Sequence, residues 1–178
     1  MKLIPATPDG DTHDGVVSRF INPGEFFFHE ENCQIHTLLG SCIAITLWHP
    51  VLKVGGMCHF VLPGSSNPVF NLDDSEHNGR YSDGAMALFE IEAQRYGTQL
   101  NEYHAKIFGG SNMLADMSSR KDGLIGEKNT EAAVMHLSEK GIPLLVAHVG
   151  ETGYRRIAFD VCSGDVWVKH EILQKFID

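Results

Sequence analysis

Residues 38–60 read LLGSCIAITLWHPVLKVGGMCHF and predict an antiparallel β-hairpin. Two apolar runs flank the turn-forming stretch HPVL at residues 49–52. Pro50 suits the second position of a type I turn, because its φ is fixed near the value that this position needs. If the hairpin is symmetric about the Pro50–Val51 bond, Cys42 lies directly opposite His59.

Apolar alternation assigns the two faces of this hairpin. Ile43, Ile45 and Leu47 share one face, which we expect to be the core. Cys42 and His59 share the other, where directly opposed side chains start roughly 4.5–5.5 Å apart at Cβ. A slip of one residue would move the whole apolar set to the opposite face, so the pattern favours this pairing. A bulge at residues 55–56 would disturb it.

A thiol beside an imidazole can carry out acyl transfer. His59 would accept the thiol proton of Cys42, and the thiolate would attack an electrophilic carbon. The resulting oxyanion needs hydrogen-bond donors, which glycine-rich backbone can supply. The candidate substrate-binding residues are therefore Gly40, Ser41, Gly109 and Gly110. A third polar group normally orients the histidine, and Thr37 and His36 are the nearest candidates.

Two other interpretations compete with catalysis at these cysteines. A lone cysteine in a strand is usually a small buried hydrophobe, which we expect of Cys33, Cys58 and Cys162. A zinc site formed by Cys33, His36, Cys42 and His59 is a second alternative, but no close Cys or His pair with typical ligand spacing supports it.

Length and charge exclude several classes of protein. The 178 residues suffice for one domain with a core. No apolar run is long enough to cross a membrane, and the first twenty residues do not resemble a secretory signal, so we expect a cytoplasmic protein that is not membrane-embedded. A net charge of −9 disfavours nucleic-acid binding.

Further elements follow along the chain. Residues 1–19 are expected to be a mobile N-terminal arm, because residues 5–18 are rich in Pro, Gly, Asp and Thr and show no period. Residues 20–178 would then form a single domain. Strands are predicted at 24–30, 34–39, 105–110 and 143–150, the last one buried, with a terminal hairpin at 156–168. Helices are predicted at 82–96, with Ser82 as N-cap and Gly97 as the stop, and at 126–141. Residues 64–84 form a long polar connection.

Several of these segments resemble the CheD family of bacterial chemotaxis, the chemoreceptor glutamine deamidases. The matching segments are PGEFFF, TLLGSCIAITLW, GGMCHFVLP, RYSDGAMALFE, KIFGGSNM, IGEKN and TGYRRIAFDVCSGDVWVK, which together span about residues 20–172. The resemblance implies an α/β layered sandwich with mixed, largely antiparallel sheets and two to three helices, in agreement with the elements above. The segment GETG at residues 150–153 departs from the adjacent glycines expected there.

The same resemblance implies a function and a set of partners. The activity would be hydrolysis of selected glutamine side-chain amides on methyl-accepting chemotaxis receptors, with release of ammonia. Cys42 would form a thioester, His59 would act as base and then acid, and Thr37 would orient the histidine, with His36 in the neighbouring place. No metal or organic cofactor is implied, and a CheC-type phosphatase is an expected partner. A non-catalytic regulatory module for receptor or phosphatase, and a deamidase or transglutaminase acting on another protein, are the alternatives.

Overall fold

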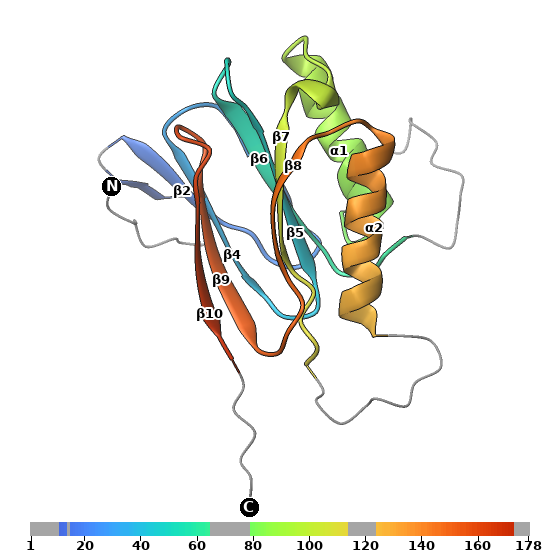
Figure 1. Ribbon diagram of the computed structural model, residues 1–178. Helices are drawn as coiled ribbons and strands as arrows, with labels where there is room; N and C mark the ends of the chain where they lie inside the picture. Colours follow the sequence, from blue (N-terminus) through green and yellow to red (C-terminus); the bar gives the residue numbers. More distant parts are fainter. Residues whose placement is uncertain (1–10, 14, 65–78, 114–123, 173–178) are drawn as a thin grey trace, which may run out of the picture.

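The computed structural model describes residues 11–13, 15–64, 79–113 and 124–172. These residues form two five-stranded sheets, two α-helices and one 3₁₀ helix, η1. The elements are β1 (Asp11–His13), β2 (Val16–Phe20), β3 (Phe26–His29), β4 (Cys33–Leu39), β5 (Ile43–His49), β6 (Val54–Phe60), α1 (Ser82–Arg95), η1 (Leu100–Glu102), β7 (His104–Gly109), α2 (Ile125–Glu139), β8 (Leu144–Val149), β9 (Tyr154–Asp160) and β10 (Val166–Glu171). Figure 1 shows three layers, in which the sheets face each other and both helices cover the far face of one sheet.

The predicted layered sandwich is confirmed. The first sheet has the order β1-β2-β4-β9-β10 and the second the order β3-β6-β5-β7-β8. Among the described strands, the β2–β4 and β7–β8 pairs are parallel and the others antiparallel. Because β4 belongs to the first sheet and β5 to the second, residues 40–42 carry the chain from one sheet to the other.

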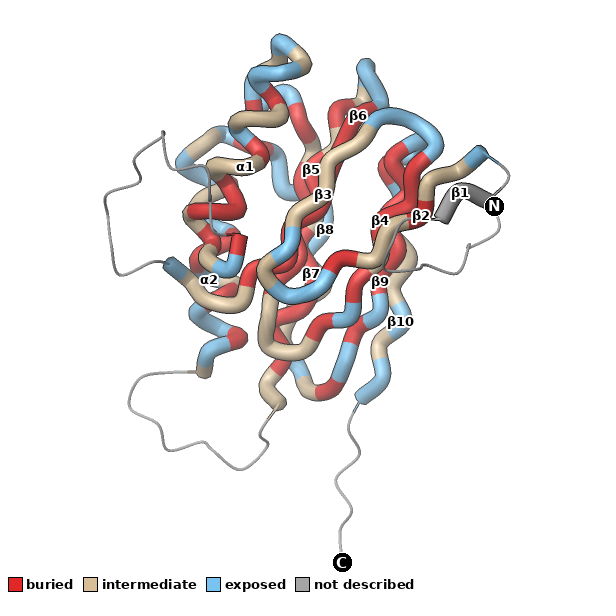
Figure 2. Tube along the Cα trace, turned by 180° about the vertical axis from the view of Figure 1, so that it is seen from behind, coloured by how far each residue is buried: buried red, intermediate tan, exposed pale blue. Residues whose placement is uncertain are grey.

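Two hydrophobic cores lie on either side of the second sheet. Side chains alternate along β5, so Ile43 and Ile45 pack with Phe89 under the helices, whereas Ala44 packs with Phe159 between the sheets. A strand covered on both faces reads as a nearly continuous apolar run, as β5 does. In Figure 2 the central strands are mostly buried and the edge strand β10 is partly exposed.

The predicted hairpin is present, but its register was wrong by two residues. Ala44, not Cys42, pairs with His59, because the loop has four residues instead of two. Lys53 adopts the left-handed conformation, with φ at 52°, and its N–H donates to the His49 carbonyl at 2.9 Å. The His49 ring also accepts the N–H of Leu52 at 3.1 Å. A shift of two preserves the faces, so Cys42 and His59 remain on the same side of the sheet.

The prediction that residues 143–150 form a buried strand was wrong about burial. The strand β8 is the outer strand of the second sheet. Leu145 is 54% exposed, and Leu144 and Val146 are exposed as well. A continuous apolar run is typical of a strand covered on both faces, but sequence alone does not say which strand lies at the edge of the sheet, where side chains are less covered.

The expected mobile arm was wrong in its last part. Residues Val16–Phe20 form β2, which runs parallel to β4, and Val17 packs against the core between the sheets. β1 pairs with β2 through a turn at Gly15, whose φ is 79°. The polar composition of residues 5–18 therefore does not prevent the formation of β2, in which Ser18 is buried and the other residues are partly buried. Residues 1–10, and residues 65–78 of the predicted long connection, lie outside the described residues.

Both helices begin and end close to their predicted bounds. Gly97 and Gly141 follow them with φ at 66° and 65°, as expected of helix stops. The predicted N-cap at Ser82 was wrong, because Tyr81 holds that position without a side-chain cap. The Ser82 hydroxyl instead donates to the Pro63 carbonyl and contacts His136 Nε2 at 3.0 Å.

Candidate active site

The half-buried Cys42 lies in the turn that connects the two sheets. The glycine-rich segment after β7 holds this turn from the side. The Gly110 N–H donates to the Cys42 carbonyl and the Ser111 N–H to the Gly40 carbonyl, both at 2.9 Å. The candidate residues Gly40, Ser41, Gly109 and Gly110 are therefore all brought to the turn of Cys42.

Glycine is required where the two segments touch. A Cβ on Gly109 would lie 2.1 Å from the Cys42 carbonyl oxygen, and the φ of Gly109 is 109°. Because the N–H of Gly110 is already bonded to that carbonyl, it is not a free donor for an oxyanion. The glycines bring the backbones close together, and the Gly110 N–H stabilises the turn.

The side chains of His59 and Thr37 are hydrogen-bonded to each other. Thr37 Oγ1 lies 2.8 Å from His59 Nδ1 and donates to the Ile21 carbonyl at 2.7 Å. A hydroxyl has one hydrogen, and a carbonyl only accepts, so Thr37 accepts the Nδ1–H of the ring. His59 Nε2 then carries the lone pair, and it is buried with no partner among the described residues.

Of the two candidates for orienting the histidine, Thr37 makes the contact. His36 precedes it on β4, so the two side chains point to opposite faces of the first sheet. The contact therefore crosses the space between the sheets: Thr37 comes from the first and His59 from the second.

Cys42 and His59 are diagonal neighbours on one face. Continuing the register of β5 and β6 by one residue pair sets Cys42 opposite Val61, two positions beyond His59. Diagonal neighbours lie roughly 7–8 Å apart at Cα and somewhat closer at Cβ. The thiol does not hydrogen-bond to Nε2 in this state. Catalytic hydrogen bonds are often long or open before substrate binds.

Burial keeps both groups neutral near pH 7. It raises the pKa of the Cys42 thiol, against the opposing effects of the Arg80 charge and of the cysteine's own backbone N–H. Burial also lowers the pKa of His59 to about 4, against the opposing charge of Glu25. A nucleophilic attack by Cys42 would therefore require that the thiol proton first move to a base such as Nε2 of His59.

Sequence reasoning missed a buried arginine that supports the glycine-rich segment. Arg155 is 1% exposed, and its guanidinium donates to Ser111 Oγ at 2.6 Å and to His148 Nδ1 at 2.8 Å. Arg155, Ile157 and Phe159 occupy every second position of β9 and therefore share one face of the strand. This spacing could have predicted that Arg155 is buried. A second missed residue, Asn129, contacts the cysteine turn from α2.

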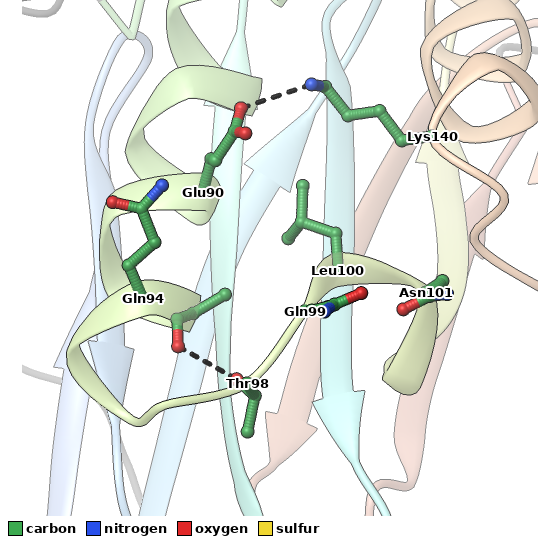
Figure 3. Close-up of a pocket in the computed structure, with 8 residues that line it drawn as sticks. Glu90, Gln94, Thr98, Gln99, Leu100, Asn101 and Lys140 are labelled. Carbon is green, nitrogen blue, oxygen red and sulfur yellow. Dashed lines mark hydrogen bonds and ion pairs between the residues drawn. The ribbon is translucent and has the colours of Figure 1, made fainter.

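A pocket of about 360 Å³ lies away from this site, where α1, η1 and the end of α2 meet. Figure 3 shows Glu90 and Lys140 paired across it, with Gln94, Thr98 and Leu100 among the side chains around them. None of the predicted site residues lines it.

Among the described residues, no group of three or more His, Cys, Asp or Glu side chains is placed to hold a metal. Cys33 lies in the core between the sheets, where burial raises its pKa to about 12. No helix within the described ranges is long and apolar enough to cross a membrane.

The structure thus places a half-buried cysteine and a buried histidine on one face of the second sheet, with a hydroxyl of the first sheet in contact with the histidine. A family model described as CheD chemotactic sensory transduction matches residues 61–170. The "Probable chemoreceptor glutamine deamidase CheD 3" of Dechloromonas aromatica is 44% identical over 149 residues, covering 84% of this chain and 85% of that protein. The chain belongs to the CheD family.

Two further relatives carry the same family name. The "Probable chemoreceptor glutamine deamidase CheD 2" of Albidiferax ferrireducens is 44% identical, covering 86% of this chain and 87% of its own. The CheD of Pseudomonas savastanoi pv. phaseolicola is 38% identical, covering 92% and 90%. A solved structure, the hypothetical protein YfiH of Bacillus licheniformis, aligns with a TM-score of 0.41 and 12% identity over 82% of this chain and 63% of that one. That likeness is too weak to support an inference.

Proposed function

We propose that this protein is a cysteine-dependent protein-glutamine deamidase that converts glutamine side chains of methyl-accepting chemotaxis receptors to glutamate. Membership of the CheD family and the names of relatives that match most of the chain support the substrate and the reaction. The observation that carries the mechanism is the hydrogen bond from His59 to Thr37, because it leaves Nε2 unprotonated on the face that holds Cys42.

The reaction proceeds in two halves. His59 Nε2 takes the thiol proton while Cys42 Sγ attacks the side-chain amide carbon, forming a tetrahedral oxyanion. The imidazolium returns that proton to the leaving nitrogen, so ammonia departs and a thioester remains. Water then attacks the thioester while His59 takes a proton from the water. The C–S bond breaks, the imidazolium returns the proton to Cys42 Sγ, and the glutamate side chain is released.

The test compares wild type with Cys42→Ala on a purified receptor. Wild type is expected to convert glutamines to glutamates, seen as the corresponding mass change in receptor peptides and as released ammonia. Cys42→Ala is expected to do neither. Equal conversion by both proteins would rule out the thioester mechanism, and the same receptor without enzyme measures spontaneous deamidation.

We also propose a CheC-type phosphatase as a partner, which the family resemblance implies, and a cytoplasmic location, which was expected from the sequence. Co-purification of the two proteins and fractionation of cells would test them. Capture of receptor or phosphatase without any ammonia release from wild type would instead favour the non-catalytic regulatory module.

A further inference from the structure

Asn129 contacts both chain segments that supply the candidate catalytic pair. It lies on α2 and is fully buried. Its side-chain Nδ2 donates to the Ser41 carbonyl at 3.0 Å and to the Val61 carbonyl at 2.9 Å. Both acceptors are carbonyl oxygens, so the orientation of the carboxamide is fixed by its partners: only the NH₂ end can face them.

The two carbonyls belong to the two functional segments. The Ser41 carbonyl is part of the peptide bond that leads into Cys42, and Val61 follows His59 by two residues, directly after the end of β6. Val61 is also the position opposite Cys42 when the hairpin register is continued. One side chain therefore ties the segment of the sulfur to the segment of the imidazole.

The other end of the carboxamide is left without a bond. Asn129 Oδ1 is buried and has no partner among the described residues. An unpaired buried acceptor costs free energy, which an apolar side chain of similar volume would avoid. The two donated bonds are the benefit that this polar side chain brings to the position.

We propose that Asn129 is a positioning residue that sets the approach of Cys42 Sγ to His59 Nε2; this inference deepens the proposed function and rests on it. The thiol and Nε2 are not hydrogen-bonded at rest, so their meeting depends on how the two backbones are held. Thr37 fixes the ring, Gly110 supports the cysteine turn from one side, and Asn129 sets the distance between the turn and the histidine strand.

The test uses Asn129→Leu, which keeps the branched heavy-atom skeleton and removes both donors, and Asn129→Ala as a second variant. On receptor substrate, kcat is expected to fall about 100-fold with KM unchanged. The second readout needs no receptor: alkylation of Cys42 by iodoacetamide is measured against pH. Near pH 7 wild type is expected to react faster than His59→Gln, because the imidazole accepts the thiol proton when the two side chains approach each other. The Asn129→Leu rate is expected to fall to the His59→Gln rate, because that approach is lost.

Thr98→Val is the matched control. It removes a hydroxyl that bonds the Ala93 carbonyl and Tyr103 Oη far from the site, so its alkylation profile and kcat should stay at the wild-type level. The inference is overturned if either folded Asn129 variant alkylates and turns over like wild type, or if Thr98→Val loses as much. If wild type deamidates no receptor, the proposed function fails, while the alkylation profiles still test the positioning role.

Discussion

The single hydrogen of the Thr37 hydroxyl is donated to the Ile21 carbonyl, and this fixes the protonation pattern of His59. The ring must donate through Nδ1 and keep its lone pair at Nε2. An orienting hydroxyl carries no charge, unlike the carboxylate of many triads, so it does not raise the basicity of the ring. The low pKa of His59, about 4, is consistent with a neutral partner in a buried place.

Replacing Thr37 should therefore affect orientation more than charge. Thr37→Val keeps the shape but cannot accept the Nδ1–H, so the ring can turn or change tautomer. We expect kcat for deamidation to fall by about 10²-fold, with a loss of about 1–3 kcal/mol in unfolding free energy from the unpaired groups. Thr37→Ser, which keeps the hydroxyl, should restore most activity. An active Thr37→Val would show that this hydroxyl is dispensable.

At the scale of the elements, the segment from β7 into Gly109–Ser111 supports the cysteine turn by close backbone contact. Gly110 has φ at 63°, and a Cβ there would lie 2.4 Å from Thr130 Oγ1 and 2.9 Å from the Gly126 carbonyl oxygen. The segment is thus confined between the turn and the first residues of α2. Any added side chain must push one of these neighbours away.

Comparing Gly110→Ala with Gly97→Ala separates crowding from backbone strain. Gly97 has a similar φ of 66° but open space around it. Gly97→Ala should cost about 1 kcal/mol from the left-handed conformation alone. Gly110→Ala should cost about 1–3 kcal/mol more from overpacking, and should reduce activity by displacing the Cys42 carbonyl. Urea denaturation measures both, and equal losses would contradict this account.

The elements also show where sequence reasoning succeeds and where it stops. Apolar alternation placed Cys42 and His59 on one face of the hairpin, because the period of a strand is two. The register required the length of the turn, which depends on Lys53 adopting a positive φ and on the His49 side chain bonding the loop. Both are details of local geometry. The same limit applied to β8, whose place at the end of a sheet is set by which strands pair.

At the scale of the whole molecule, the site residues converge from parts of the chain that sequence separates. Thr37 was suggested by its closeness to Cys42, but Asn129 reaches the cysteine turn, and Arg155 the glycine-rich segment beside it, only through the packing of α2 and β9. The hairpin pattern predicted the roles of Cys42 and His59, and the family resemblance carried the orienting role onto Thr37. Their tautomer, burial and supporting contacts required the assembled fold.

The buried His59 should also make the stability of the whole protein depend on pH. Its pKa is about 4 when folded and 6.5 ordinarily, so the unfolded chain takes up the proton first as pH falls. The part of the unfolding free energy that depends on neutral His59 is fully present above pH 6.5. It is lost as pH falls towards 4, by about 3 kcal/mol in total. Between these values wild type should lose more unfolding free energy than His59→Gln. Parallel curves from urea titrations at each pH would contradict this.

The division of Thr37 and His59 between two sheets ties the proposed chemistry to completed folding. A polypeptide that has assembled only the second sheet already brings its sulfur and its base near each other, yet it lacks the hydroxyl that selects the reactive tautomer. Incompletely folded chains, whether newly synthesised or damaged, would therefore not deamidate neighbouring proteins. The two-sheet arrangement thereby limits an irreversible modification of other proteins to enzyme molecules that have folded completely.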